Sequence, residues 1–95
     1  MNLLPIGSIV KLRDNDNRMM IIGFHPENDK GEKRDYVAVV YPMGMMGIES
    51  MLFFNNSDIE EVVFQGYLNR QHETLLKLME DLYEELENNN TKENL

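Results

Sequence analysis

The chain lacks cysteine and any apolar run long enough to cross a membrane. Cysteine is absent from all 95 residues, and because a secreted domain of this size usually depends on disulfide bonds, we expect a reducing, cytoplasmic compartment. Exported proteins of Gram-positive bacteria also often lack cysteine, which leaves export as an alternative. The N-terminal sequence MNLLPIGSIVKLR has neither a basic region nor a long apolar region, so we expect no signal peptide. A membrane-spanning helix requires about 20 apolar residues. No apolar run in this sequence approaches that length, so we expect no membrane partner.

Positive charge is scarce. The chain has 9 Lys and Arg against 17 Asp and Glu, which gives a formal net charge of −8. Nucleic-acid binding requires clustered Lys and Arg that displace counterions from phosphates, and anionic membranes attract basic residues in the same way. We therefore expect no nucleic-acid partner. An acidic surface suits a basic protein partner, but it also keeps a small protein soluble, and the second explanation is favoured.

Catalytic and metal-binding patterns are missing as well. His25 and His72 are far apart in sequence and no cysteine accompanies them, so nothing indicates a zinc site. The run from Asp14 to Asn17 resembles a calcium loop, but His25 stands where that loop requires a bidentate acid, and a hairpin turn is the better interpretation. No triad, activated nucleophile or phosphate-binding loop is evident. We expect a protein that is not an enzyme and that binds no cofactor or metal.

The residues that are present predict one small domain built mainly of strands. Hydrophobic residues make up 42% of the chain, as in ordinary folded proteins. Strand-forming segments are predicted from period-two patterns and β-branched residues at 6–12, 18–24, 36–41, 48–55 and 62–64. The second of these, RMMIIGF, is apolar enough to be buried on both faces. Asn55–Ser57 provide N-caps for a turn over Asp58–Glu61.

The last third of the chain has the period of an amphipathic helix. Apolar residues recur there at alternating spacings of four and three: Leu68, His72, Leu75, Met79, Leu82 and Leu86. Asn69 is the expected N-cap, and Asn88–Thr91 is the expected end, with a frayed tail over 89–95. The predicted fold class is therefore α+β and mainly β. About five short antiparallel strands form a curled meander or open barrel-like sheet over residues 1–67, and one C-terminal amphipathic helix covers 68–88.

The predicted helix offers a first candidate protein-binding surface, the helix seam: His72, Leu75, Leu76, Met79, Leu82, Tyr83 and Leu86. Packing on the chain's own sheet is one explanation of this apolar face. The apolar arc is wider than one seam, however, because Leu76, Leu78 and Tyr83 extend it, so the helix can face both its own sheet and a partner. A homodimer through this helix is a further expectation. His72 is either a partly buried residue or a pH-sensitive contact.

A second candidate surface, the Met corner, consists of Met43, Met45 and Met46. These residues lie in a segment that contains Gly44 and Gly47, where turns normally carry polar side chains. Methionine is a flexible apolar side chain that fills cores and also makes adaptable contacts with partner helices. Core filling and partner binding are equally good explanations of the Met corner, whereas Cu(I) binding is poorly supported without cysteine or a nearby histidine.

Four segments of the chain carry a family resemblance: LLPIGSIVKL, RMMIIGF, DYVAVVYPMG and FFNNSDIEEVVFQGY. In this order and spacing, over about residues 3–67, the chain resembles a small bacterial domain of unknown function. That domain is encoded beside LXG-type polymorphic toxins and the type VII, ESX-like secretion machinery of Gram-positive bacteria. The resemblance implies a cytosolic accessory that helps a toxin to fold, stay inert or reach the secretion apparatus, and it carries over no catalytic residue.

We therefore expect a non-enzymatic cytosolic protein-binding accessory, first of all an adaptor, targeting factor or chaperone for a type VII secretion LXG toxin. Its partner would be the toxin or a secretion component. The alternative is an immunity protein that neutralises the toxin domain, for which an acidic surface would suit a basic nuclease. An enzyme that uses a lone carboxylate is the third interpretation.

Overall fold

A computed structural model describes the backbone of residues 2–93 and the side chains of residues 2–86. The chain divides into two compact units. The first, Leu4–Tyr67, contains every strand and is called the sheet unit. The second, the helical unit, combines residues 1–3 with residues 68–95 and contains α1 (Arg70–Glu93).

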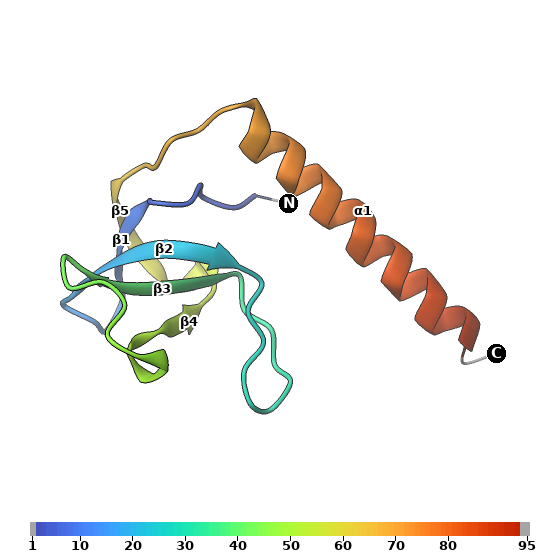
Figure 1. Cartoon of the computed structure of the whole chain (residues 1–95), viewed down its shortest axis with the longest axis horizontal. Helices are drawn as coiled ribbons and strands as arrows, with labels where there is room; N and C mark the ends of the chain where they lie inside the picture. The colour runs from blue at the N-terminus through green and yellow to red at the C-terminus, as the bar shows by residue number, and fades with distance from the viewer. Residues whose placement is uncertain (1, 94–95) are drawn as a thin grey trace. The chain divides into compact units, whose positions relative to one another are not determined.

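The sheet unit is a single five-stranded antiparallel sheet. Its strands are β1 (Ile9–Leu12), β2 (Arg18–Phe24), β3 (Tyr36–Tyr41), β4 (Leu52–Phe54) and β5 (Ile59–Phe64). The spatial order is β4-β3-β2-β1-β5, so the first four strands form a meander and the last strand returns to pair with the first (Figure 1). The predicted fold class, mainly β with one C-terminal helix, is confirmed.

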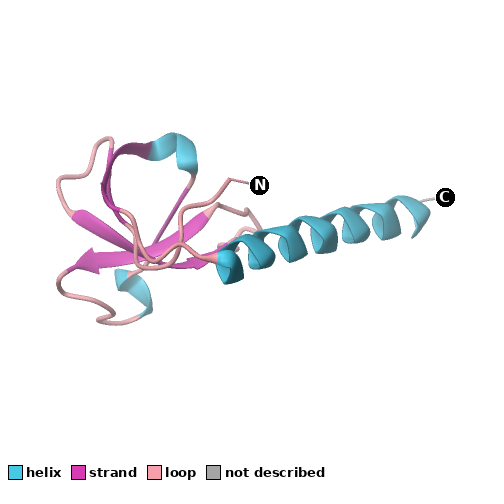
Figure 2. Cartoon of the chain, turned by 90° about the horizontal axis from the view of Figure 1, so that it is seen from above, coloured by secondary structure: helices cyan, strands magenta, loops and turns pink. Residues whose placement is uncertain are grey.

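Strand and turn boundaries differ from the sequence prediction at several places. β1 begins at Ile9 rather than residue 6, and the fourth predicted strand divides into a 3₁₀ turn, Ile48–Ser50, and the short β4 (Figure 2). The turn predicted at Asp58–Glu61 is wrong. The 3₁₀ turn lies earlier, at Asn56–Asp58, and β5 starts at once with Ile59. Asn55 is the N-cap of this turn, and Asp58 at its third position completes a capping box, because its Oδ2 accepts the Asn55 N–H at 2.9 Å.

Most of the core of the sheet unit lies along one face of the meander, although the consecutive β3 residues Ala38 and Val39 are both buried. The prediction that 18–24 is buried on both faces is wrong, since Met19 and Ile21 are buried while Ile22 is exposed. This alternation follows from the pleat, which turns successive side chains to opposite faces of a sheet. The other buried apolar residues of the unit are Val10, Leu12, Tyr36, Ala38, Val39 and Phe54.

Tyr36 links the core to two polar segments. Its ring packs against Phe24 and Phe54, with centroids 6.3 and 5.4 Å away. Its hydroxyl oxygen accepts the Leu4 N–H at 2.9 Å, and the hydroxyl donates to Asn56 Oδ1. A buried phenol requires such partners. This one side chain therefore connects β3 with the N-terminal segment and with the turn before β5.

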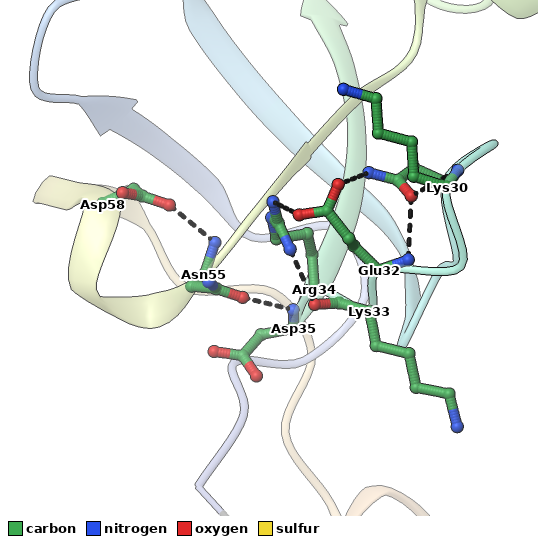
Figure 3. A network of polar contacts seen from close by, with 8 residues as sticks. Lys30, Glu32, Lys33, Arg34, Asp35, Asn55 and Asp58 are labelled. Atoms are coloured by element: carbon green, nitrogen blue, oxygen red, sulfur yellow. Dashed lines mark hydrogen bonds and ion pairs between the residues drawn. The ribbon is translucent and has the colours of Figure 1, made fainter.

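The loop between β2 and β3 is a hydrogen-bonded structure rather than a loose connection. Asn28 Oδ1 accepts the backbone N–H groups of Lys30 and Glu32, at 3.0 and 2.9 Å. The Glu32 carboxylate in turn binds Asn28 Nδ2 and Arg34 (Figure 3). At the base of the loop, the Asp35 N–H donates to Asn55 Oδ1 at 2.9 Å, which joins this loop to the residues that follow β4.

The two ends of the sheet unit meet at Gly66. The Gly66 N–H donates to the buried hydroxyl of Ser8 at 2.9 Å. A Cβ atom at Gly66 would lie only 2.2 Å from the carbonyl oxygen of Ile6, so only glycine allows this approach. The contact brings together LPIGS and the segment that ends in Gly66-Tyr67, which are the most specific parts of the family resemblance.

In the helical unit, α1 begins one residue after its predicted N-cap. Asn69 Oδ1 accepts the His72 N–H at 3.1 Å, and Asn69 O accepts the Glu73 N–H. These bonds satisfy donors that have no partner inside a helix. The helix continues to Glu93 as one uninterrupted element, past the predicted end at Asn88–Thr91 (Figure 2). Residues 94 and 95 of the predicted frayed tail lie outside the described residues.

Candidate protein-binding surfaces

The Met corner lies between β3 and β4, and its side chains are exposed. Met43, Met45 and Met46 are between 55% and 66% exposed, and Ile48 in the following turn is 78% exposed. Core filling therefore does not account for these methionines. A group of neighbouring exposed apolar side chains is uncommon on a monomeric protein and often marks an interaction site.

The backbone beneath the Met corner is well organised. The Met46 N–H donates to Ser50 Oγ at 3.1 Å, and the Ser50 hydroxyl donates to Gly47 O at 2.6 Å. Gly44, with φ of 77°, allows the chain to turn, and its N–H donates to Val40 O at 2.8 Å. Flexible apolar side chains thus stand on a backbone fixed by hydrogen bonds, which lowers the entropy lost when a partner binds.

The structure divides the helix seam into two parallel rows. His72, Leu76, Met79 and Tyr83 form a half-buried row. Leu75, Leu82 and Leu86 are 40%, 54% and 45% exposed, and Leu78 beside them is 61% exposed. We call the exposed set, Leu75, Leu78, Leu82 and Leu86, the leucine row. Because spacings of three and four place residues on one face of a helix, the row is a continuous apolar strip.

His72 contacts the N-terminal segment within the helical unit. Its Nε2 lies 3.0 Å from the carbonyl oxygen of Leu3. A carbonyl oxygen only accepts hydrogen bonds, so Nε2 carries the hydrogen and donates it. This bond assigns His72 a structural contact in the unit.

The sequence did not reveal that the end of the sheet unit is exposed. Val62, Val63 and Phe64 on β5 are 45–58% exposed, and Tyr67 is 82% exposed. A run of β-branched and aromatic residues normally indicates a buried strand, but β5 is at the edge of the sheet and lies beside only one strand. The adjoining Glu60 and Glu61 were the available signal, because charged residues commonly protect edge strands.

The shifted pKa values of the described residues have structural causes. The Lys11 ammonium, which forms an ion pair with Glu60, lowers the pKa of that carboxyl. Hydrogen bonds from Asn28 and then from Arg34 lower the pKa of Glu32. Burial raises the pKa of Tyr36, and the Asp35 carboxylate adds to the effect. Each group is held by a neighbour that shapes a turn or a strand pair.

Within residues 2–93, no group of three or more potential metal-binding side chains comes together. The same residues include no helix with the length and apolarity that a membrane crossing requires. The described residues present exposed apolar surfaces instead: the Met corner and the exposed side chains of β5 on the sheet unit, and the leucine row on the helical unit.

Comparison with known proteins gives a family for this chain. Neither the curated proteins nor the solved structures include a significant match. The family model described as "Domain of unknown function (DUF4176)" matches residues 3–75. This range includes all five strands, the contact between Ser8 and Gly66, and the first turns of α1. The chain therefore belongs to the DUF4176 family.

Proposed function

We propose that this protein is a non-enzymatic, cytosolic protein-binding accessory. Its partner is an LXG toxin of a type VII secretion system, for which it acts as an adaptor, targeting factor or chaperone. The partner class comes from the resemblance of residues 3–67 to domains encoded beside such toxins. The observation that supports a binding role is the exposure of Met43, Met45 and Met46 on an ordered loop.

The proposed mechanism is burial of the apolar Met corner of an acidic protein against its partner. Methionine side chains adapt to the shape of a partner, and burying them provides most of the affinity. The net charge of −8 would orient a basic partner and speed association more than it would add affinity.

A binding assay with the toxin divided into its two domains tests the proposal. An adaptor binds the N-terminal secretion domain or the secretion machinery. An immunity protein binds the C-terminal toxic domain and restores growth of cells that produce it. Binding to the C-terminal domain together with growth rescue would replace the proposal with the immunity function, and binding to neither domain would remove the toxin as partner.

The Met corner is tested by replacing Met43, Met45 and Met46 with glutamine together. Because these side chains are exposed, the free energy of unfolding should change by less than about 1 kcal/mol. Affinity for the N-terminal domain of the toxin should fall at least tenfold, or about 1.4 kcal/mol. Ile22→Gln, an exposed apolar side chain on β2, is the matched control and should leave affinity unchanged. Equal affinity of the triple variant and the parent would exclude the Met corner as the contact.

A further inference from the structure

We infer that the leucine row of α1 is the binding surface for a partner helix that carries two basic side chains, one turn apart, beside its apolar stripe. The inference deepens the proposed function, because it states what the toxin or secretion component presents to α1, and it rests on that function. It is carried by three features of α1: the exposed leucines, the hollow between their side chains, and the carboxylates at one end of the row.

The hollow indicates that the partner is a helix. It is lined by Gln71, Thr74, Leu75 and Leu78, together with Arg70. The first four are successive neighbours at spacings of three, one and three on a single helix face. In coiled coils, a side chain of one helix inserts into a hole formed by four residues of the facing helix. The N-terminal half of the leucine row therefore has the shape that receives one large apolar side chain from another helix.

The carboxylates indicate the charge of the partner. Asp81 and Glu85 lie one turn apart, beside Leu78 and Leu82, and like charges at this spacing destabilise a helix. Lys77 is one turn before Asp81, yet no ion pair joins them, and neither carboxylate is paired with any side chain that the structure describes. Two basic side chains on a bound helix would relieve this repulsion and form two ion pairs.

The same charges disfavour a second copy of the chain as the occupant. A parallel copy would place Asp81 and Glu85 next to the same two acids. An antiparallel copy would place them next to Arg70, Gln71 and Thr74, which offer one positive charge for two carboxylates. Lys77 lies on the far side of α1 from the leucine row, as the helical period of 3.6 residues requires, whereas Arg70 borders the hollow. A heterologous basic helix is therefore the better occupant.

Two designed helical peptides test the inference with the full-length chain. Both carry the same leucine stripe; one has two lysines, one turn apart, beside the stripe, and the other has two glutamates there. Fluorescence anisotropy should show about tenfold tighter binding of the lysine peptide at low salt, since two exposed ion pairs replace two repulsions. The preference should shrink as salt is added, because screening weakens exposed ion pairs.

Matched double variants distinguish the acids beside the leucine row from acids on the opposite side of α1. Asp81→Asn with Glu85→Gln should remove most of the preference for the lysine peptide. Glu73→Gln with Glu84→Gln removes the same charge from the opposite side of α1 and should preserve the preference. Leu78→Gln with Leu82→Gln should abolish binding of both peptides.

The inference is overturned by equal affinity for the two peptides, by no binding of the lysine peptide, or by the same loss in both acid double variants. A dimer in sedimentation experiments that the leucine variant dissociates would show that a second copy covers the row, and would also overturn it. If the toxin's N-terminal domain binds the Asp81 and Glu85 variant as tightly as the parent, the proposed function stands and only this inference fails.

Discussion

At the scale of residues, the sheet unit depends on a few contacts between segments that are distant in sequence. Gly66 and Ser8 are 58 positions apart and joined by a buried hydrogen bond. Tyr36 connects Leu4 to Asn56 through its hydroxyl. Each of these residues is required either by a close backbone approach or by a buried hydrogen bond. Its replacement therefore lowers the free energy of unfolding by more than the few atoms changed would suggest.

Gly66→Ala should lower the free energy of unfolding by about 2–3 kcal/mol. The added Cβ would meet the carbonyl oxygen of Ile6 and the Ser8 nitrogen, and relieving such overpacking moves the backbone. Gly44→Ala is the control, because its φ of 77° strains alanine but nothing lies within 4 Å, so about 1 kcal/mol is expected. Urea denaturation measures both variants, and equal losses would contradict the steric explanation.

Tyr36 should make stability pH-dependent at high pH. Burial raises the pKa of its hydroxyl, so the folded chain keeps this proton to a higher pH than the unfolded chain does. The stabilisation is complete below the ordinary tyrosine pKa of about 10 and is lost as pH rises above it. The free energy of unfolding, measured at pH 8 and at pH values above about 10, should decrease with pH in the parent. The decrease should be smaller in Tyr36→Phe.

Tyr41→Phe is the control for this pH dependence, and Tyr36→Phe should also lower stability at neutral pH. Tyr41→Phe removes an exposed phenol and should keep the decline of the parent. Tyr36→Phe should also cost about 1–3 kcal/mol at neutral pH, because the Leu4 N–H and Asn56 Oδ1 lose their partner. A decline as steep in Tyr36→Phe as in the parent would assign the pH dependence to other groups.

At the scale of elements, α1 and β5 share a property: both leave apolar side chains exposed. In β5 this results from its position at the sheet edge. In α1 the half-buried row and the leucine row divide one apolar arc. Helix stability in water depends on burying such an arc, so α1 gains from any partner that covers the leucine row.

Leu75→Ala and Leu82→Ala should each lower the free energy of unfolding by well under 2 kcal/mol. Their side chains are exposed, whereas a fully buried leucine costs about 2–5 kcal/mol when replaced by alanine. Ile21→Ala, in the core of the sheet unit, is the control and should show a loss in that higher range. Thermal denaturation measures all three, and a core-sized loss in either leucine variant would mean that the leucine row is buried in the folded protein.

At the scale of the molecule, the two compact units have different kinds of stabilising structure. The sheet unit contains all five strands, the aromatic contacts of Tyr36 and the bond between Ser8 and Gly66. The helical unit contains one long helix and the contact of His72 with Leu3. The sheet unit has an apolar core of its own, which is the usual condition for independent folding.

A chain that ends at Tyr67 should therefore fold. Its circular dichroism spectrum should be of the β type and it should unfold cooperatively in urea, because the core residues and both partners of the Ser8–Gly66 bond are retained. Binding that depends on α1 should be lost. An unfolded spectrum would show that the sheet unit requires α1 in order to fold and would contradict the independence of the sheet unit.

Local patterns were enough to predict the fold class. The four-and-three spacing located α1, and β-branched residues located β3, because both signals come from neighbours in the sequence. The exposure of Val62 and Phe64 was missed, since burial depends on which strand becomes the edge. The close approach of Gly66 to Ile6 was also beyond prediction, because that glycine is required by a segment almost sixty positions away. For the candidate site, the sequence located both apolar surfaces but not the division of the helix seam into two rows.

The contact between Ile6–Ser8 and Gly66 has a consequence for protein engineering. It places the entry and the exit of the sheet unit at the same point on the fold. Domains with adjacent ends tolerate circular permutation and insertion into the loops of other proteins. The sheet unit can thus be inserted into a loop of another protein through short linkers. Such a fusion would present the Met corner without α1.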